Sequence, residues 1–371
     1  MNNTEKRYLF CCETGYQLFN AINLRISVAN DAPADVILAE QTDFSQILDN
    51  LKNANIFDHV VRPNSREYSE LFWAADLETQ ILWYQNPSKL IPTFPTKYVY
   101  SDFFIPIDHI YWQLLYYHQL NRGIKARIHF FEEGLRAYTM DFITTEKNRK
   151  FVLDHYRDHS FANSIVDFYL YEPELYSNDN FEGELKNLPK IHSRESAIAK
   201  SILKVFPVPE LPKEKFIFFE ESYIGDKRLA NDFELFEQIV SVVGRDNIIV
   251  KRHPRNKIDR FSMRGYKVMD NWTTPWEASL LNNDVKDHIF VTVSSTASLT
   301  PMLLFDEDVK SIHLLNIFKG DSPLLADPGF KACYLKTLEL CNRQTINVYK
   351  PFTIEEALEI VHYLNITNGK D

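Results

Sequence analysis

Short apolar runs alternate with longer amphipathic stretches in the first part of the chain. Residues 7–12 (RYLFCC) form an apolar run typical of a short buried strand. In residues 13–30 the apolar positions recur at helical spacing, and Thr14 stands where the N-cap of that helix would lie. This alternation predicts a parallel sheet with helices on both faces. Further strands are expected at 34–40, 58–63, 97–102 and 126–134, with helices at 43–55 and 107–121.

A polar, proline-bearing stretch from about residue 172 to 215 interrupts the alternation. It is typical of a linker around one short helix at 193–206, and Pro207, Pro209 and Pro212 mark a domain boundary. The alternation then starts again, which predicts two α/β domains, 1–205 and 206–371, with the last helix able to pack back on the first domain. In the second domain strands are expected at 215–222, 247–254, 267–270, 288–295 and 309–315, with helices at 231–244, 275–283 and 296–305. Two such domains place a ligand in the cleft between them, at the carboxyl ends of the strands.

Composition limits the kinds of partner. The chain has 371 residues, 45% of them hydrophobic, which is enough for a large core. Its formal net charge is -10, which argues against a nucleic acid partner, so any anion site must be local. The four cysteines suit neither a disulfide framework nor a metal site, which favours a reducing cytoplasm. No apolar stretch has the length of a signal sequence or membrane span, but the aromatic stretch 110–120 leaves peripheral membrane contact open.

A hydroxyl-rich turn follows one predicted strand. Residues 291–298, VTVSSTAS, lead from an apolar run into a predicted helix. Backbone N–H groups, the helix dipole and the hydroxyls of Ser294, Ser295 and Thr296 would converge there on an anion such as phosphate. The same residues also suit an ordinary helix N-cap, so both interpretations stay open.

A compact basic cluster surrounds His253 at the end of another predicted strand. Lys251, Arg252 and Arg255 flank the histidine, and Pro254 favours an extended conformation for it. In an acidic chain this cluster predicts an anion pocket in which a protonated imidazole supports a leaving phosphate. The alternative is a solvated basic loop.

Glu132, Glu133 and Gly134 end the predicted strand 126–134. One carboxylate would suit a general base, and Gly134 would allow a substrate to approach closely. Because neighbouring residues of a strand point to opposite sides, at most one of the two carboxylates is expected to face the cleft, and the sequence does not say which. The pair could instead cap a helix or form an ion pair with Arg136. Elsewhere the sequence has no Gly-rich phosphate loop, no nucleophile elbow and no metal-ligand motif, so no metal or redox cofactor is expected.

Four motifs in order resemble a known family. They are Glu132-Glu133-Gly134, His253-Pro254, Pro275-x-Glu277 and Ser294-Ser295, on two Rossmann-like halves. Together they resemble the bacterial sialyltransferases, most closely glycosyltransferase family 52, with the family 38 polysialyltransferases and family 80 sialyltransferases as relatives. The stretch ETGYQLFNAI after the first strand is also similar to the N-terminal part of family 52. The chain departs from the commonest pattern in having Glu-Glu where Asp-Asp or Glu-Asp is frequent.

The resemblance implies a GT-B fold, with two Rossmann-like doubly wound domains facing a central cleft. It implies an inverting, metal-independent sialyltransferase that moves sialic acid from CMP-sialic acid to a hydroxyl of a lipooligosaccharide or capsular glycan. Residues 1–205 would then serve the acceptor and carry the general base, and 206–371 would bind the CMP. The protein would be cytoplasmic or peripheral on the inner face of the membrane, with its oligomeric state open, a homodimer included.

The resemblance also implies a role for individual residues. Glu133 or Glu132 matches the general base, His253 supports the departing phosphate, and Glu277 holds the ribose hydroxyls. The remaining residues around the CMP would be Ser294, Ser295, Thr296, Pro254, Lys251, Arg252 and Gly134. Alternatives are a GT-B transferase that uses CMP-Kdo or CDP-glycerol, and a GT-B-like partner subunit without activity. The aromatic residues Tyr111, Trp112, Tyr116 and Tyr117 suit either sugar stacking or the core.

Overall fold

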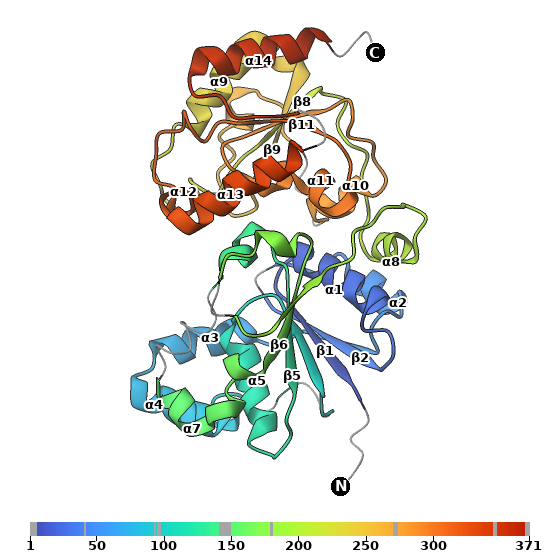
Figure 1. Ribbon diagram of the computed structural model, residues 1–371, viewed down its shortest axis with the longest axis vertical. Coiled ribbons are helices and arrows are strands. Elements are labelled where there is room, and N and C mark those ends of the chain that lie inside the picture. The colour runs from blue at the N-terminus through green and yellow to red at the C-terminus, as the bar shows by residue number, and fades with distance from the viewer. Residues whose placement is uncertain are drawn as a thin grey trace. The chain divides into compact units, whose positions relative to one another are not determined.

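The computed structural model describes residues 6–40, 42–92, 94, 98–140, 150–178, 181–269, 274–343 and 347–367. The chain forms two compact units, shown in Figure 1. The first comprises Met1–Pro207 with Thr273–Pro275, and the second Val208–Trp272 with Trp276–Asp371. The division after Pro207 lies within the proline-bearing stretch of the sequence.

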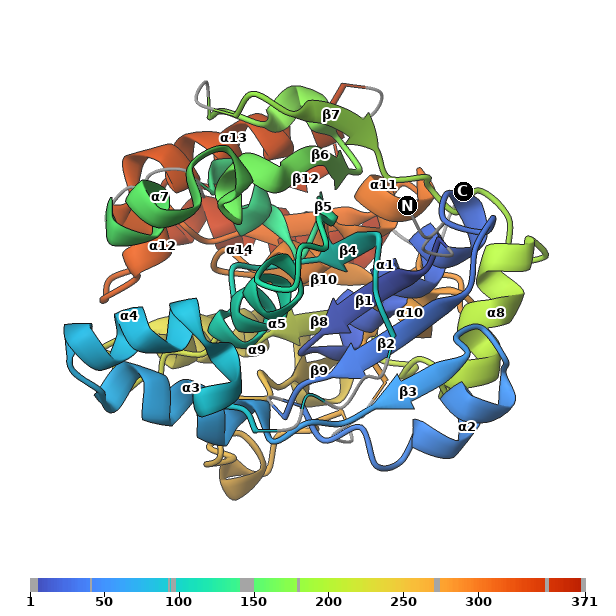
Figure 2. The ribbon, with the colours of Figure 1, turned by 90° about the horizontal axis from the view of Figure 1, so that it is seen from below.

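The first unit is built on a parallel sheet with seven described strands in the order β3-β2-β1-β4-β5-β6-β7, which Figure 2 shows side by side. Its order reverses between β1 and β4, and such a switch point is where open α/β sheets bind ligands. Strands β1 and β2 are both buried along their whole length, because helices cover both faces of the sheet. The strands are β1 (Tyr8–Cys12), β2 (Ala34–Leu38), β3 (His59–Val61), β4 (Asp102–Ile105), β5 (Arg127–Phe131), β6 (Ile165–Leu170) and β7 (Glu184–Asn187).

Helices lie on both faces of the first sheet (Figure 1). On one face are α1 (Gly15–Ser27), α2 (Leu48–Asn53) and α8 (Ala197–Val205), and on the other α3 (Ser65–Ala74), α4 (Leu77–Gln85), α5 (Ile110–Leu120) and α7 (Lys150–Tyr156). The predicted cap of α1 is confirmed, since the Thr14 hydroxyl accepts a hydrogen bond from the Gln17 backbone N–H. Helix α5 is buried nearly all round, so its aromatic residues, Tyr111, Trp112, Tyr116 and Tyr117, belong to the core and not to a sugar platform.

Two predictions for the first unit were wrong. The strand expected at 97–102 lies later, because β4 begins at Asp102 and Tyr100 is instead a buried loop residue whose hydroxyl donates to Asp35. The supposed linker contains β7, which pairs with β6 at the edge of the sheet. Its sequence, ELKN, has no apolar run, because an edge strand with three exposed residues and one half-buried residue needs none.

The second unit has a parallel sheet with five described strands in the order β12-β11-β10-β8-β9. The order reverses between β8 and β10, which makes a second switch point. The strands are β8 (Phe216–Phe219), β9 (Ile248–Lys251), β10 (Ile289–Thr292), β11 (Lys310–His313) and β12 (Val348–Tyr349). Helices α9 (Asp232–Val243) and α14 (Ile354–Thr367) cover one face, and α10 (Trp276–Leu280), α11 (Thr300–Phe305), α12 (Pro323–Ala326) and α13 (Pro328–Cys341) lie on the other (Figure 1).

Three details of the second unit differ from the predictions. The last helix, α14, packs on α9 through Ala357, Val361 and Leu364 and so belongs to the second core, not to the first domain. The strand expected at 267–270 is a single bridge between Val268 and Val250. The helix expected at 296–305 is broken, because Thr296–Ser298 form a 3-10 turn and α11 begins only at Thr300.

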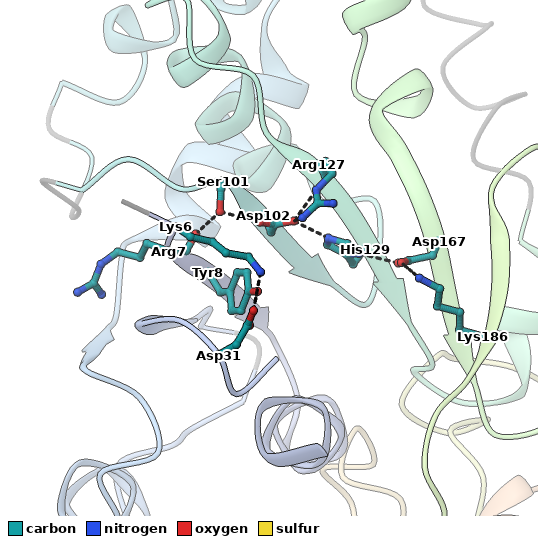
Figure 3. A network of polar contacts seen from close by, with 10 residues as sticks. All are labelled: Lys6, Arg7, Tyr8, Asp31, Ser101, Asp102, Arg127, His129, Asp167 and Lys186. Atoms are coloured by element: carbon teal, nitrogen blue, oxygen red, sulfur yellow. Dashed lines mark hydrogen bonds and ion pairs between the residues drawn. The ribbon is translucent and has the colours of Figure 1, made fainter. Parts of the chain in front are cut away.

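A largely buried polar network joins four strands of the first sheet, β4 to β7 (Figure 3). The His129 ring lies between two carboxylates, with Nε2 2.8 Å from Asp102 Oδ1 and Nδ1 2.7 Å from Asp167 Oδ1. Arg127 also binds Asp102 Oδ1, at 2.7 Å, and Lys186 binds Asp167 Oδ2 at 2.8 Å. Burial disfavours the charged ring, but the hydrogen bonds to the two aspartates outweigh it and raise the pKa of His129. The network therefore ties β4 to β7 at the end of the sheet opposite to the switch-point residues described next.

Candidate active site

Four titratable side chains gather at the carboxyl ends of strands in the first unit. Glu13 directly follows β1, His109 lies between β4 and α5, and Glu132 and Glu133 directly follow β5. Because β1 and β4 flank the switch point, these residues occupy the edge where doubly wound sheets bind their ligands.

Glu132 is the buried member of the carboxylate pair, with 2% of its surface exposed. Its Oε1 accepts from the Tyr16 hydroxyl at 3.2 Å, and its Oε2 accepts from the Tyr171 backbone N–H at 3.1 Å and from the Tyr138 hydroxyl. Burial raises the pKa of Glu132 to about 7 against the opposing effect of these donors. Both oxygens of Glu132 thus accept hydrogen bonds, and these bonds connect the loop after β5 to α1 and to the end of β6.

Glu133 is half-buried and has one hydrogen-bond partner among the described residues, the Gln17 amide, whose Nε2 lies 3.4 Å from Oε2. The orientation of Gln17 is set by its own Oε1, which accepts the Glu13 backbone N–H at 2.6 Å and so leaves Nε2 to face Glu133. Burial raises the pKa of Glu133 to about 7, partly offset by Gln17 and by the Arg136 charge. Of the two neighbouring carboxylates, Glu133 therefore has the free oxygen and the access to solvent.

Glu13 and His109 form a close pair that the sequence analysis did not predict. Glu13 is 6% exposed, and its Oε1 lies 3.3 Å from His109 Nε2. His109 Nδ1 accepts from the Tyr111 backbone N–H at 3.1 Å, so the neutral ring carries its proton on Nε2, toward Glu13. Burial lowers the pKa of His109 to about 4, while burial and the Glu133 charge raise the pKa of Glu13 to about 7. Glu13 could have been found by its place directly after an apolar strand, but nothing in the sequence near His109 marks it.

In the second unit, polar residues follow three adjacent strands, β8, β9 and β10. Glu220 and Glu221 follow β8, His253 comes two residues after β9, and Ser294 comes two residues after β10. Because β8 and β10 flank the switch point, the residues predicted to bind an anion do lie along one edge of this sheet.

His253 is held by backbone contacts on two sides. Its N–H donates to Glu220 Oε2 at 3.2 Å, and its Nδ1 accepts from the Arg255 N–H at 3.2 Å. Burial, followed by the charges of Arg255 and Lys251, lowers the pKa of His253 to about 4. The ring is therefore neutral near pH 7 with its proton on Nε2, and the protonated imidazole expected beside a leaving phosphate stays a prediction.

Lys251, Glu277 and Trp276 form the next part of this edge. The Lys251 ammonium lies 6.0 Å from the centroid of the Trp276 ring, and the Trp276 indole N–H donates to the Ala297 carbonyl at 2.8 Å. Burial raises the pKa of Glu277, opposed by the Lys251 charge and the Thr300 hydroxyl. These contacts bring the helix α10, the end of β9 and the turn after β10 together around Glu277.

The three hydroxyl residues after β10 are not equivalent. Ser294 is 5% exposed, and both its N–H and its hydroxyl donate to Glu221, at 2.5 Å and 3.0 Å. Ser295 and Thr296 are half-buried, and their hydroxyls make no hydrogen bond within the described part of the chain. Ser294 is thus occupied by a carboxylate, while the next two hydroxyls are available to a ligand.

Some of the predicted CMP residues have other contacts. Arg252 binds the Asn256 carbonyl at 2.5 Å and the Asp259 carboxylate at 3.4 Å, so its guanidinium stabilises the 252–259 loop, while its buried Nε has no hydrogen-bond partner within the described residues. Pro254 is exposed. Gly134 lies in the first unit, next to Glu133, and its φ of 122° is a conformation that side chains rarely adopt.

No group of three or more His, Cys, Asp or Glu side chains in the described ranges could hold a metal ion. Among these residues, no helix has the length and apolar character needed to cross a membrane.

Comparison with known proteins gives only distant likenesses. No family model and no curated protein matches the chain. Among solved structures, it is similar to Arabidopsis thaliana UGT89C1 complexed with UDP-L-rhamnose, at 10% identity over 99% of this chain and 90% of that chain, with a TM-score of 0.48. It is similar to Acinetobacter baumannii MurG, at 10% identity over 98% and 91%, with a TM-score of 0.44. It is also similar to Methanocaldococcus jannaschii UDP-GlcNAc 2-epimerase, at 12% identity over 96% and 99%, with a TM-score of 0.40.

At these identities and TM-scores the likenesses carry no argument about activity. The fold assignment rests on the two sheets themselves, each parallel, each covered by helices on both faces and each with a switch point. The expected α/β fold is confirmed in this form: two Rossmann-like units in series, the pair of units from which a GT-B fold is made.

Proposed function

We propose that the protein is an inverting glycosyltransferase that moves sialic acid from CMP-sialic acid to a hydroxyl of a glycan acceptor, such as a lipooligosaccharide or capsular polysaccharide. One observation carries the proposal. Each unit has polar side chains at its own switch point, and the two sets are complementary: a half-buried carboxylate with a pKa of about 7 in the first, and hydroxyl, imidazole and carboxylate ligands in the second.

The first unit is assigned the acceptor. Glu133 takes the proton of the acceptor hydroxyl on its free oxygen, while Gln17 holds the other oxygen. The acceptor oxygen forms a bond to the anomeric carbon, and the bond from that carbon to the phosphate oxygen breaks, its electron pair leaving with CMP. A pKa of about 7 suits this task, because a base is most effective when its pKa lies near the working pH.

The second unit is assigned the donor. As negative charge develops on the departing phosphate, the His253 Nε2–H, the hydroxyls of Ser295 and Thr296 and the Lys251 ammonium can stabilise it. Glu277, partly exposed beside these groups, can accept hydrogen bonds from the ribose hydroxyls. A leaving group with one phosphate develops less charge than a diphosphate, so the proposal includes no metal cofactor.

The test is nucleotide release by the purified chain. CMP-sialic acid, CMP-Kdo, CDP-glycerol and a UDP-hexose are supplied in turn with a mixed glycan acceptor, and free nucleotide is measured. We expect CMP release from CMP-sialic acid, its loss in His253→Ala, and no change in the matched control His362→Ala, an exposed histidine of α14. If only CMP-Kdo or only CDP-glycerol gives free nucleotide, that compound is the donor in place of CMP-sialic acid. If no donor gives free nucleotide, the assignment as an enzyme is wrong, and a binding protein or partner subunit is favoured.

A further inference from the structure

Glu221, at the carboxyl end of β8, forms hydrogen bonds with the turn after β10, which the sequence predicted to bind phosphate. Its Oε1 accepts the Ser294 backbone N–H at 2.5 Å, its Oε2 lies 3.0 Å from the Ser294 hydroxyl, and the Tyr223 hydroxyl donates to Oε2 at 2.8 Å. The backbone N–H and the hydroxyl of Ser294 are therefore already paired with a carboxylate of the chain itself.

The neighbouring carboxylate has a similar effect. Glu220 accepts the His253 backbone N–H at 3.2 Å and pairs with Arg260 at 3.2 Å. The donors that remain at this edge include the His253 Nε2–H, the hydroxyls of Ser295 and Thr296, the backbone N–H groups of Thr296 and Ala297, and the Lys251 ammonium. This set can satisfy the oxygens of one phosphate group.

Two carboxylates also interact with residues of this edge. Glu221 is bound to Ser294, next to Ser295, and Glu277 interacts with Thr300 and with Lys251. A second phosphate group close to Ser295 would find the donors of Ser294 already taken by Glu221 and would lie beside that carboxylate. An anion about 5 Å from a carboxylate in such a partly buried site is strongly repelled.

We infer that Glu221 is a specificity-determining residue, which restricts the donor to nucleotides with a single phosphate and excludes nucleoside diphosphates. Ser294 then holds Glu221 in place and is not itself a phosphate ligand. This inference rests on the proposed function, because it assumes that the second unit binds the nucleotide.

The experiment measures the affinities of CMP and CDP for the full chain by isothermal titration calorimetry. Glu221→Gln removes the charge and keeps the shape of the side chain, and Glu221→Ala removes the side chain beyond the β-carbon. Glu359→Gln, an exposed residue of α14, is the matched control for the change in net charge. Circular dichroism establishes that each variant is folded.

We expect the wild type and Glu359→Gln to bind CMP at least about tenfold more tightly than CDP. Glu221→Gln should bring the two affinities to within about threefold, chiefly by tighter binding of CDP. Equal binding of the two nucleotides by the wild type would overturn the inference, as would full preference for CMP in a folded variant without the Glu221 charge. Binding of neither nucleotide by the wild type would overturn the proposed function itself, which distinguishes the two failures.

Discussion

Replacing Glu132 with glutamine should make the first unit less sensitive to pH. Burial raises the pKa of this carboxyl from 4.5 to about 7 in the folded chain. Between these two values the folded state keeps a proton that the unfolded state has lost. The stability that this proton confers is fully present below about pH 4.5 and is lost as the pH rises to about 7, a change of about 3 kcal/mol.

Glutamine can replace the protonated carboxyl without steric change. Its amide oxygen can take the place of Oε2, which accepts from Tyr138 and from the Tyr171 N–H, and its NH₂ can donate to the Tyr16 oxygen. Because the amide never ionises, Glu132→Gln should have nearly the wild-type stability at pH 5 and should be about 3 kcal/mol more stable than the wild type at pH 8.

Hydrogen exchange of the β5 amides, followed by mass spectrometry between pH 5 and pH 8, measures this difference within the first unit, whether or not the whole chain unfolds in one step. Glu182→Gln, at an exposed glutamate of the same unit, is the matched control and should follow the wild type at every pH. If the free energies of opening of Glu132→Gln and the wild type differ by the same amount at all pH values, the carboxyl does not titrate near 7 and the reasoning is wrong.

Three further predictions concern single residues of the first unit. Glu133→Gln should lower transfer by about 10²–10⁴-fold, and wild-type kcat/KM should fall about tenfold for each pH unit below 7, because only the ionised carboxylate takes the proton; a profile flat from pH 5 to 7 would exclude this base. Gly134→Ala should destabilise the unit by about 1–3 kcal/mol, since φ is 122°, and an unchanged melting temperature would contradict it. His129→Gln should cost about 3 kcal/mol in urea denaturation at pH 6. Because the pKa of His129 is raised, the ring's contribution is complete below its unfolded pKa and is lost as the pH rises through the folded value, so the variant should cost less at pH 9; an equal cost at both pH values would refute this.

Local patterns in the sequence were enough for most of the secondary structure. Buried strands such as β1 and β8 are short apolar runs, and the N-cap of α1 depends on Thr14 and Gln17, three residues apart. Elements without an apolar run were missed or misplaced. The edge strand β7 has no buried residue, and α11 begins only at Thr300, with Pro301 in its first turn, a boundary that helical periodicity does not reveal.

The sequence by itself determined that the chain has two α/β units and that polar residues follow their strands, because strand ends and turn residues are local features. Only the tertiary structure decided what each of those residues contacts. Glu132 meets Tyr16 across 116 positions, and Ser294 meets Glu221 across 73. Residues that are distant in the sequence decide whether both oxygens of a carboxylate already accept hydrogen bonds. They also decide whether a serine hydroxyl can still bind a ligand. Adjacent residues of the same type, Glu132 and Glu133, therefore differ in a way that no local pattern could predict.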